Sequence, residues 1–368
     1  MVWPTTPRAP SDPRSQQRGA AIVSVLVLVT LASMLVASLF WRQHLGTRSV
    51  LNRQASAQLR WIETAVLDWA AVVLRSDQNS SGQVDHLQET WAVPVAETRL
   101  DETVTAGARI SGRDRSALIA GQIVDAQARL NLSNLVHDGE PVARQVAAYR
   151  RLLASLGLPP ELEAPLTDRL RMAYPAPAAS AASGGASPSP GGGAPSSAQP
   201  TAPSGTPSGA PPGASTAASA KASLPPVLKV RDLLRLPGYD ERVLATLAPF
   251  VILLPKSVPT GAGVSQTAAT RVNANTASAE VLAALAENLS IDAARRLVLL
   301  RERVAFSTLE QLTDRGDPQA IFSSEFFSVG SNFFLVAGVV RFERIEASSE
   351  ALFFRGATRV ELVWRQHY

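Results

Sequence analysis

The sequence predicts an α+β protein in which one long N-terminal helix packs on an antiparallel β-sheet, and a large inserted all-α domain interrupts that sheet. Three observations predict this class. No proline lies between Pro13 and Pro94, so one helix can run through most of that interval. Apolar segments typical of strands occur before residue 135 and after residue 331. Helical periodicity fills much of the interval between them.

The composition narrows the classes of function. The chain has 368 residues, which is enough for two modest domains, and 46% of them are hydrophobic. Its formal net charge of +4 is too small for a polybasic surface, so nucleic acid is not an expected partner. The chain has no cysteine, which excludes disulfides, thiolate metal sites and a cysteine nucleophile.

The N-terminal apolar segment has the length of a membrane-spanning helix. Residues 20–41 carry no charged side chain, and as a helix they would be roughly 33 Å long, enough to cross a bilayer core. A cleavable secretory signal has an apolar region of only about 7–15 residues. Residues 1–19 carry three arginines and one aspartate, and this positive leader predicts an N-terminus in the cytoplasm.

The same helix is expected to continue beyond the membrane, so that it spans residues 20–75. Apolar residues recur there at steps of three or four, which predicts an amphipathic helix with a narrow apolar stripe. The apolar positions are Leu51, Ala55, Leu59, Ile62, Val66, Trp69 and Val73. The polar segment 76–82 is expected to end the helix.

Two separate stretches should supply the strands of one sheet. Residues 76–135 form its first part and residues 331–368 its second part. The expected strands lie in 103–111, 118–124, 333–344 and 351–365. In the last of these, Val360, Leu362 and Trp364 alternate with charged residues, as in a strand with one buried face.

Residues 136–330 are expected to form the inserted α-helical domain, built from helix-hairpin-helix or SAM-like units. Helical periodicity covers residues 142–156, 161–172, 230–251, 271–285 and 291–303. Thr276 is in a position to cap a helix. Residues 175–223 are almost entirely Ala, Pro, Ser, Gly and Thr, and such a segment cannot bury enough apolar surface to offset its ordering entropy. We therefore expect a disordered low-complexity loop there.

The boundary between leader and apolar segment resembles the type IV pilin and pseudopilin class. In that class a short basic leader ends in glycine and is followed by an apolar helix that continues as an amphipathic one, as at Arg18-Gly19-Ala20 here. The resemblance implies that prepilin peptidase cleaves between Gly19 and Ala20, that the new N-terminus at Ala20 is methylated, and that the apolar helix is retained. Glycine suits such a site because a backbone without a Cβ can extend into the protease.

Ser24 stands at the fifth position of the mature chain, where most members of the class have glutamate. An unpaired buried charge is costly in an apolar environment, so a subunit that lacks this glutamate suits a filament interior poorly. The K-type minor pseudopilin, which lies at the filament tip, typically lacks it. Ser24 alone is equally compatible with a polar residue that a membrane helix tolerates.

Two asparagine-containing phrases resemble the K-type family of type II secretion systems. They are GQIVDAQARLNLSNL at residues 121–135 and RVNANTASAEVLAAL at residues 271–285. In the family, the first phrase ends a strand and enters the inserted domain, so Asn131, Ser133 and Asn134 are expected to be turn and helix-cap residues. On these grounds the chain is identified as a member of the K-type minor pseudopilins.

The resemblance implies a role in assembly at the tip of the pseudopilus, where the subunit would initiate or cap assembly for protein export across the outer membrane. The implied partners are the I- and J-type minor pseudopilins, the major pseudopilin, prepilin peptidase and the inner-membrane assembly platform. The implied location is the bacterial inner membrane, which the chain crosses once, with the N-terminus in the cytoplasm and the C-terminal domain in the periplasm.

The calcium site of the family is not expected in this chain. The resemblance implies that an acidic segment of the inserted domain supplies the ligands, and calcium needs several converging oxygen atoms. The acids between residues 161 and 240 are Glu161, Glu163, Asp168, Asp232 and Asp240, which form no cluster in the sequence. We therefore expect no cofactor and no metal site.

Two other classes of function have less support. The alternative is a membrane-anchored helix-hairpin-helix protein that binds or takes up DNA. Its candidate phosphate contacts are Arg295, Arg296, Arg301 and Arg303. The connection at 286–292 has no glycine and carries two acids, unlike the hairpin of such modules. An enzyme is not expected, and no catalytic residue is predicted, because the sequence has no nucleophile elbow, phosphate loop or histidine metal-ligand spacing.

Overall fold

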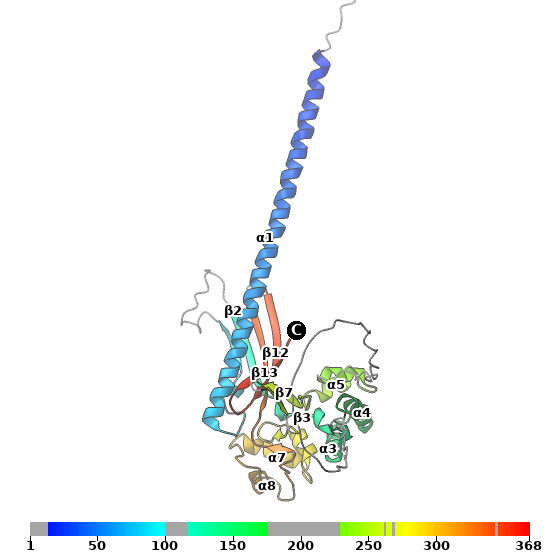
Figure 1. The fold of residues 1–368 in the computed structure, drawn as a ribbon, viewed down its shortest axis with the longest axis vertical. Helices are drawn as coiled ribbons and strands as arrows, with labels where there is room; N and C mark the ends of the chain where they lie inside the picture. Colours follow the sequence, from blue (N-terminus) through cyan, green and yellow to red (C-terminus); the bar gives the residue numbers. More distant parts are fainter. Residues whose placement is uncertain (1–13, 100–116, 176–228, 261–262, 267–268, 343–344) are drawn as a thin grey trace, which may run out of the picture.

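A computed structural model describes residues 14–99, 117–175, 229–260, 263–266, 269–342 and 345–368. One long helix extends from a head that contains a sheet and a group of shorter helices (Figure 1). Three expectations lie outside the described residues: the leader up to residue 13, the strand at 103–111 and the low-complexity loop from residue 176 onward.

Helix α1 spans Arg14–Ser81, 68 residues, and is longer at both ends than the predicted 20–75. Within it, Ala21–His44 is long and apolar enough to cross a membrane, with a mean hydropathy of 2.6, and it is 0% buried by the rest of the chain. The helix ends at Ser81, and the following Gly82 has a φ of +77°, a left-handed conformation that glycine adopts without steric cost.

The last turns of α1 remain helical because a contact with Gly356, far away in the sequence, holds them. Gln78 accepts a hydrogen bond from Arg75 at 2.7 Å and donates one to the carbonyl of Gly356 at 3.3 Å. The polar composition of residues 76–81 predicted a break, and these tertiary contacts override that local preference.

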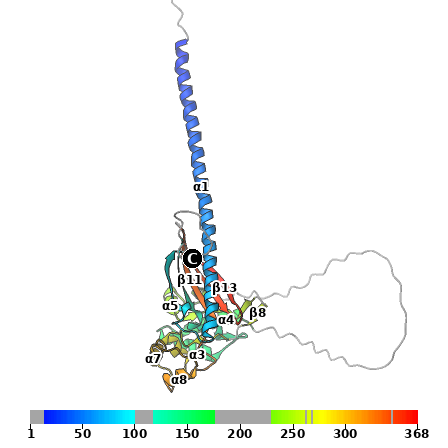
Figure 2. The same ribbon diagram turned by 90° about the vertical axis from the view of Figure 1, so that its left-hand side faces the viewer.

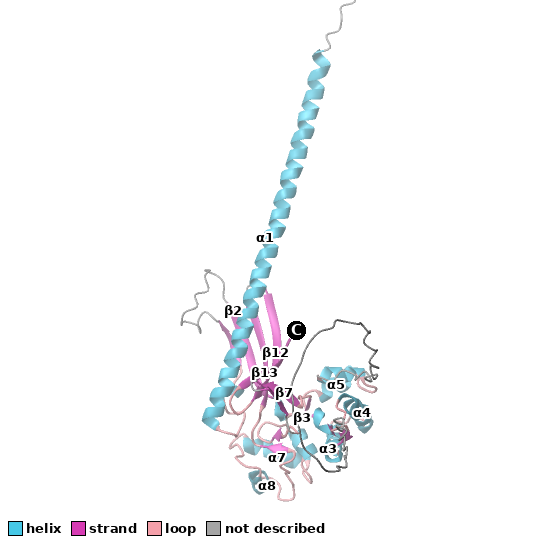
Figure 3. Cartoon of the chain, viewed as in Figure 1, coloured by secondary structure: helices cyan, strands magenta, loops and turns pink. Residues whose placement is uncertain are grey.

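In the part of the chain that the structure describes, the sheet has five strands in the order β1-β2-β11-β12-β13, and each neighbouring pair is antiparallel. The bounds are β1 Val95–Arg99, β2 Ala117–Asp125, β11 Phe333–Phe342, β12 Ile345–Arg355 and β13 Val360–His367. Figure 3 shows these strands gathered beside the lower part of α1. The predicted α+β class, with a long helix on an antiparallel sheet, is confirmed.

Residues 351–365 belong to two strands rather than one. The chain reverses after β12, where the N–H of Gly356 donates to the carbonyl of Arg359 at 2.9 Å. β13 then pairs antiparallel with β12 and forms an edge of the sheet.

The second half of α1 packs on one face of the sheet through two apolar clusters. The first contains Leu67, Ala70, Leu74, Trp91, Phe334 and Phe353. The second contains Ala55, Leu59, Val340 and Phe342. The apolar stripe that the sequence predicted is thus partly correct. Ala55 and Leu59 are buried, whereas Leu51 and Trp69 are exposed.

The chain leaves the sheet after β2 and returns at β11, and most of the interval forms an inserted helical domain. Its α-helices are α3 Ala143–Ser155, α4 Glu163–Ala173, α5 Glu241–Leu247, α6 Ala279–Leu285, α7 Ile291–Arg301 and α8 Glu310–Arg315. Its core includes the buried side chains of Tyr149, Leu152, Leu166, Leu282 and Leu297. Figures 1 and 2 place α7 and α8 at the end of the head farthest from the free end of α1.

The inserted domain is not wholly helical, contrary to the prediction. Its described residues contain four pairs of short strands: β3 Leu130–Asn131 with β6 Val251–Ile252, β4 Val136–His137 with β5 Glu140–Pro141, β7 Ser257–Thr260 with β8 Gly263–Gln266, and β9 Val272–Asn273 with β10 Phe327–Ser328. These segments are too short for periodicity to separate them from loops.

The stretch at 230–251, where helical periodicity was expected, begins with a 3₁₀ helix, η5 Val230–Arg235. This 3₁₀ helix stops at Leu236, whose extended backbone (φ −96°, ψ 146°) is what a following proline imposes. Gly238 then turns the chain with φ +85° before α5 begins.

Candidate functional site

The predicted processing site lies near the start of α1. Gly19 and Ala20 are both helical residues. Ser24 is exposed, and its hydroxyl donates to the carbonyl of Ala21 at 2.9 Å. This bond satisfies the hydroxyl within the helix, so Ser24 needs no partner outside it in an apolar environment.

An ion-paired contact fixes the middle of α1 to the edge strand β13. Glu63 is buried, and its carboxylate lies 3.1 Å from the guanidinium of Arg365 and 3.3 Å from the imidazole of His367. Because a buried carboxylate is costly unless it is paired, these contacts define how α1 sits on the sheet.

Buried polar residues gather where α1, the sheet and the inserted domain meet. We call this group the polar junction. Its members are Asp77, Asp85, Glu89, Asp125, Asn273, Thr276, Ser331 and Arg355, all of them buried. They come from the end of α1, the segment after it, β2, β12, the first residues of the phrase at 271–285 and the segment just before β11.

Arg355 is the cation at the centre of the polar junction. Its guanidinium lies 2.9 Å from Asp77 and 2.5 Å from Asp85, and it also donates to the carbonyl of Ser331 at 2.8 Å. Burial raises the pKa of Asp85 above its ordinary value, and the hydrogen bond and charge of Arg355 partly oppose that rise. Arg355 therefore joins the helix end to the sheet.

Asp125 joins the sheet to the inserted domain. Its carboxylate accepts hydrogen bonds from the hydroxyls of Thr276 at 2.5 Å and Ser331 at 2.6 Å, and from the amide of Asn273 at 3.1 Å. Burial raises the pKa of Asp125 to about 6, although these hydrogen bonds favour the charged form. The side chain sits at the last residue of β2, where the chain enters the inserted domain.

The structure corrects one predicted cap and bears out another. Ser278, not Thr276, caps α6, because its hydroxyl accepts from the N–H of Val281 at 3.3 Å while Thr276 binds Asp125. Asn131 is a cap residue, since its side chain accepts from the N–H of Ser133 at 3.1 Å. Local spacing cannot distinguish these roles, because the partner of Thr276 lies 151 residues away.

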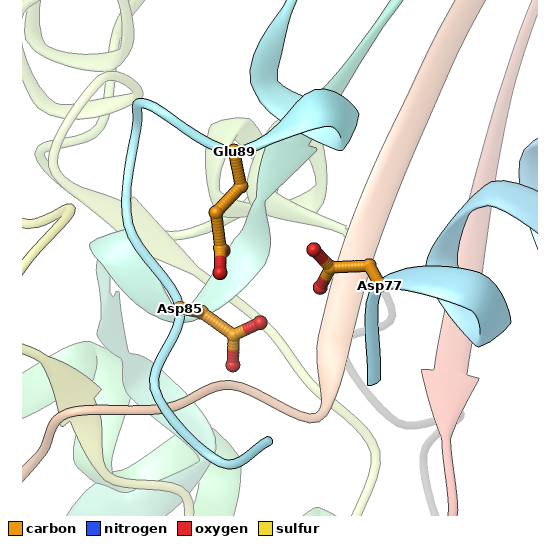
Figure 4. A group of neighbouring side chains, drawn as sticks. All are labelled: Asp77, Asp85 and Glu89. Carbon is orange, nitrogen blue, oxygen red and sulfur yellow. The ribbon is translucent and has the colours of Figure 1, made fainter. Parts of the chain in front are cut away.

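Three carboxylates of the polar junction lie close enough together to hold a metal ion. Asp77, Asp85 and Glu89 each offer one oxygen atom, and these atoms all lie within 4.8 Å of one another. Figure 4 shows the Glu89 side chain directed toward the other two carboxylates. No metal site was expected from the sequence. The group could not be foreseen, because these three positions come together only through the turn after α1.

The residues at 161–240 do not fit the calcium site that the family resemblance implies. Glu163 is bound to Arg150 at 2.6 Å and to Thr167 at 2.6 Å. Asp240 caps α5 by accepting from the N–H of Val243 at 2.7 Å. In the described parts of this segment, the carboxylates form no group of three that could hold an ion.

One of the four arginines proposed as phosphate contacts is not at the surface. Arg295, Arg296 and Arg303 are exposed, whereas Arg301 is buried and donates to the carbonyl of Ala274 at 2.7 Å. Burial also lowers the pKa of Arg301 to about 10. Arg301 is therefore a structural residue, which weakens the DNA-binding alternative.

Two sequence profiles of the family described as Type II secretion system (T2SS), protein K match the chain, at residues 128–256 and 272–329. The chain belongs to this family. The two matches lie within the inserted domain, and the second includes Asn273 and Thr276 of the polar junction. The predicted K-type membership is thereby confirmed.

A protein K relative and a solved structure extend the comparison. The Type II secretion system protein K of Pseudomonas aeruginosa strain PAO1 is 33% identical over 162 residues, which are 43% of this chain and 45% of that protein. The crystal structure of the GspK-GspI-GspJ complex from enterotoxigenic Escherichia coli contains a chain that matches with a TM-score of 0.54 at 17% identity, over 86% of this chain and 98% of that one. That match shows a shared fold. The sequence match spans less than half the length of the curated relative.

Proposed function

We propose that this protein K chain is a minor pseudopilin that initiates or caps the pseudopilus of a type II secretion system at its tip. One observation carries the proposal: the chain joins the protein K inserted domain to a 68-residue helix whose apolar part is wholly exposed. An apolar helix of this length needs lipid or neighbouring helices around it. Such a chain suits assembly rather than catalysis.

Processing would convert the precursor into an assembly-competent subunit. Prepilin peptidase would cut between Gly19 and Ala20, and Ala20 would become the methylated N-terminus. The apolar helix would then stay in the bacterial inner membrane, with its N-terminus on the cytoplasmic side and the head in the periplasm. The positive leader and the exposed span Ala21–His44 support this orientation.

The partners would be the I- and J-type minor pseudopilins, because the related solved structure is a complex of GspK with GspI and GspJ. The exposed residues of α1 offer a lateral surface for such helices, including Leu51, Trp61 and Val72 outside the membrane span. The major pseudopilin, the peptidase and the inner-membrane assembly platform complete the proposed set of partners.

Two features support a position at the tip. Ser24 stands in place of the usual glutamate, and its hydroxyl is satisfied within its own helix, so it offers no carboxylate to pair with a neighbouring N-terminus. The inserted domain also adds bulk at the end of the head farthest from the membrane span (Figure 1). This bulk would obstruct a further subunit above it.

Deletion of residues 136–330 tests the argument from size. β2 and β11 are adjacent antiparallel strands, so a short linker can replace the inserted domain without changing the strand order. The shortened subunit should appear at internal positions of the filament when crosslinked to the major pseudopilin. If it is still restricted to the tip, the inserted domain does not set the position.

Mass spectrometry of the N-terminal peptide tests the proposed function most directly. In a host with prepilin peptidase, the membrane-extracted chain should begin at a methylated Ala20, and Gly19→Val should block this processing. Gly46→Val, at another glycine of the same helix, is the matched control and should be processed normally. A chain that begins at Met1 in that host, or that has lost residues 20–41, contradicts the proposal.

A further inference from the structure

We propose that Asp77, Asp85 and Glu89 form a binding site for a divalent cation of the calcium class. The three carboxylates come from the end of α1 and from the segment that follows it, and their oxygen atoms lie within 4.8 Å of one another (Figure 4). Calcium binds oxygen ligands at about 2.3–2.6 Å, so two ligands on opposite sides of the ion are separated by up to about 5 Å. The spacing of the three oxygens fits this requirement.

The charge of the site matches a divalent ion. Asp77, Asp85 and Glu89 are exposed by only 7%, 1% and 7%. Arg355 pairs with Asp77 and Asp85 and offsets one of the three negative charges. Since buried charges are costly unless they are balanced, the two remaining charges favour an ion of charge +2.

One oxygen of Glu89 points to a missing ligand. Glu89 Oε2 accepts from the indole of Trp91 at 2.7 Å and from the N–H of His86 at 3.0 Å. Among the described residues, the buried Glu89 Oε1 has no hydrogen-bond partner, and the imidazole of His86 is 3.9 Å from it. A buried carboxylate oxygen of this kind is expensive, and a cation would satisfy it.

The segment that carries these ligands is held in place without the ion. The N–H of Asp85 donates to the carbonyl of Val329 at 2.9 Å, and the N–H of Ser331 donates to the Asp85 carboxylate at 2.7 Å. Each carboxylate has about four lone-pair sites, so Asp85 can bind Arg355 and an ion together. The remaining ligand positions would be filled by water or backbone carbonyls.

This site differs from the segment at 161–240, where the family resemblance places calcium ligands. It lies at the end of α1, and a bound ion would connect that helix end to the segment before η1 (Thr90–Ala92). Binding would therefore stiffen the joint between the membrane helix and the head. The inference does not depend on the place of the subunit in the filament.

Terbium luminescence gives a direct test with the full-length chain in detergent. Tb³⁺ takes oxygen ligands as calcium does, and an excited tryptophan close to the ion sensitises its emission. Trp91 is hydrogen-bonded to Glu89, so it is positioned as the sensitiser. Tb³⁺ added to ion-free protein should give saturable emission that Ca²⁺ suppresses by competition, and Ca²⁺ alone should raise the melting temperature by several degrees.

Variants locate the ion. Glu89→Gln should weaken Tb³⁺ and Ca²⁺ binding by about tenfold or more, while Asp292→Asn, at an exposed carboxylate of α7, should not. Trp91→Phe should remove most of the emission, whereas Trp61→Phe, at an exposed residue of α1, should leave both the emission and the calcium-dependent melting shift unchanged. Circular dichroism of each variant checks that it is folded.

Two results would overturn the inference. One is the absence of both saturable emission and a melting shift in the wild-type chain. The other is emission or a melting shift that Glu89→Gln leaves unchanged, which would place the ion elsewhere. Either result is independent of the mass of the N-terminal peptide, so it leaves the proposed function intact.

Discussion

The guanidinium of Arg355 lies 2.9 Å from the carboxylate of Asp77, although 278 residues separate them in the sequence. Both side chains are buried, and the pair links the last turns of α1 to the end of β12. Such a pair gains little net stability over apolar residues, but the loss of one partner leaves a charge that water cannot reach.

Arg355→Gln should lower the free energy of unfolding by about 3–5 kcal/mol, because it leaves Asp77 and Asp85 buried without their guanidinium. Urea unfolding of the detergent-solubilised chain in chelator-treated buffer, followed by tryptophan fluorescence, measures the change. Arg359→Gln, at an exposed arginine four residues later, is the matched control and should change stability by no more than about 0.5 kcal/mol. Equal effects of the two changes would contradict the assigned role of Arg355.

Glu63 and Arg365 should be energetically coupled across the contact between α1 and β13. Their atoms are 3.1 Å apart, and the Glu63 side chain is only 1% exposed. A double-mutant cycle with Glu63→Gln and Arg365→Gln should give a coupling energy of about 1–2 kcal/mol. A coupling near zero would show that the Glu63–Arg365 pair does not help to hold α1 on the sheet.

Gly330→Ala should destabilise the head, because a Cβ there would lie 2.0 Å from the carbonyl oxygen of Gln83, a backbone atom that cannot move alone. We expect a loss of about 1–3 kcal/mol. Gly46→Ala is the opposite case, since nothing lies within 4 Å of that Cβ and alanine favours a helix by about 1 kcal/mol. Thermal melts of the two variants, followed by circular dichroism, should shift in opposite directions.

The ionisation of Asp125 should make stability depend on pH. Its pKa is about 6 in the folded chain and 3.8 in the reference state, so the folded chain binds more protons between these values. The protonated Asp125 carboxyl therefore stabilises the folded chain fully below pH 3.8, and this stabilisation is lost as the pH rises through 6. The resulting change in the free energy of unfolding amounts to about 3 kcal/mol.

Asp125→Asn removes the ionisable carboxyl group, so a comparison with this variant separates the pH effect of Asp125 from that of other groups. Relative to the variant, the wild-type chain should lose a few kcal/mol of unfolding free energy between about pH 4 and pH 7.5. Denaturant unfolding of both chains at a series of pH values measures the difference. Parallel pH profiles for the two chains would show that Asp125 stays ionised throughout.

The elements that were predicted correctly are those with a local signal. The apolar run before His44 and the spacing of Ala55 and Leu59 indicate one helix, and both Ala55 and Leu59 are buried in the structure. The predicted strand at 118–124 corresponds to β2. In each case the side-chain period of the element appears directly in the sequence.

The polar junction could not be predicted, because its contacts depend on tertiary structure. Asp85 and Arg355 lie 270 residues apart, and nothing in the composition around either residue indicates the other. Thr276 has the spacing of a helix cap, yet its hydroxyl binds Asp125 in β2. The segment 76–81 has the composition of a turn, and contacts to Gly356 keep it helical.

The inserted domain has a consequence for how the chain folds. Phe334 of β11 pairs with Asp125 of β2, and the hydroxyl of Ser331 reaches the Asp125 carboxylate at 2.6 Å, so the whole domain occupies the place of the turn in a β-hairpin. A loop of this length is slow to close as a random chain. If the domain folds first, it delivers the two strands to each other already aligned. We therefore expect destabilising substitutions in the core of the inserted domain to slow formation of the sheet, even when they change no contact within the sheet.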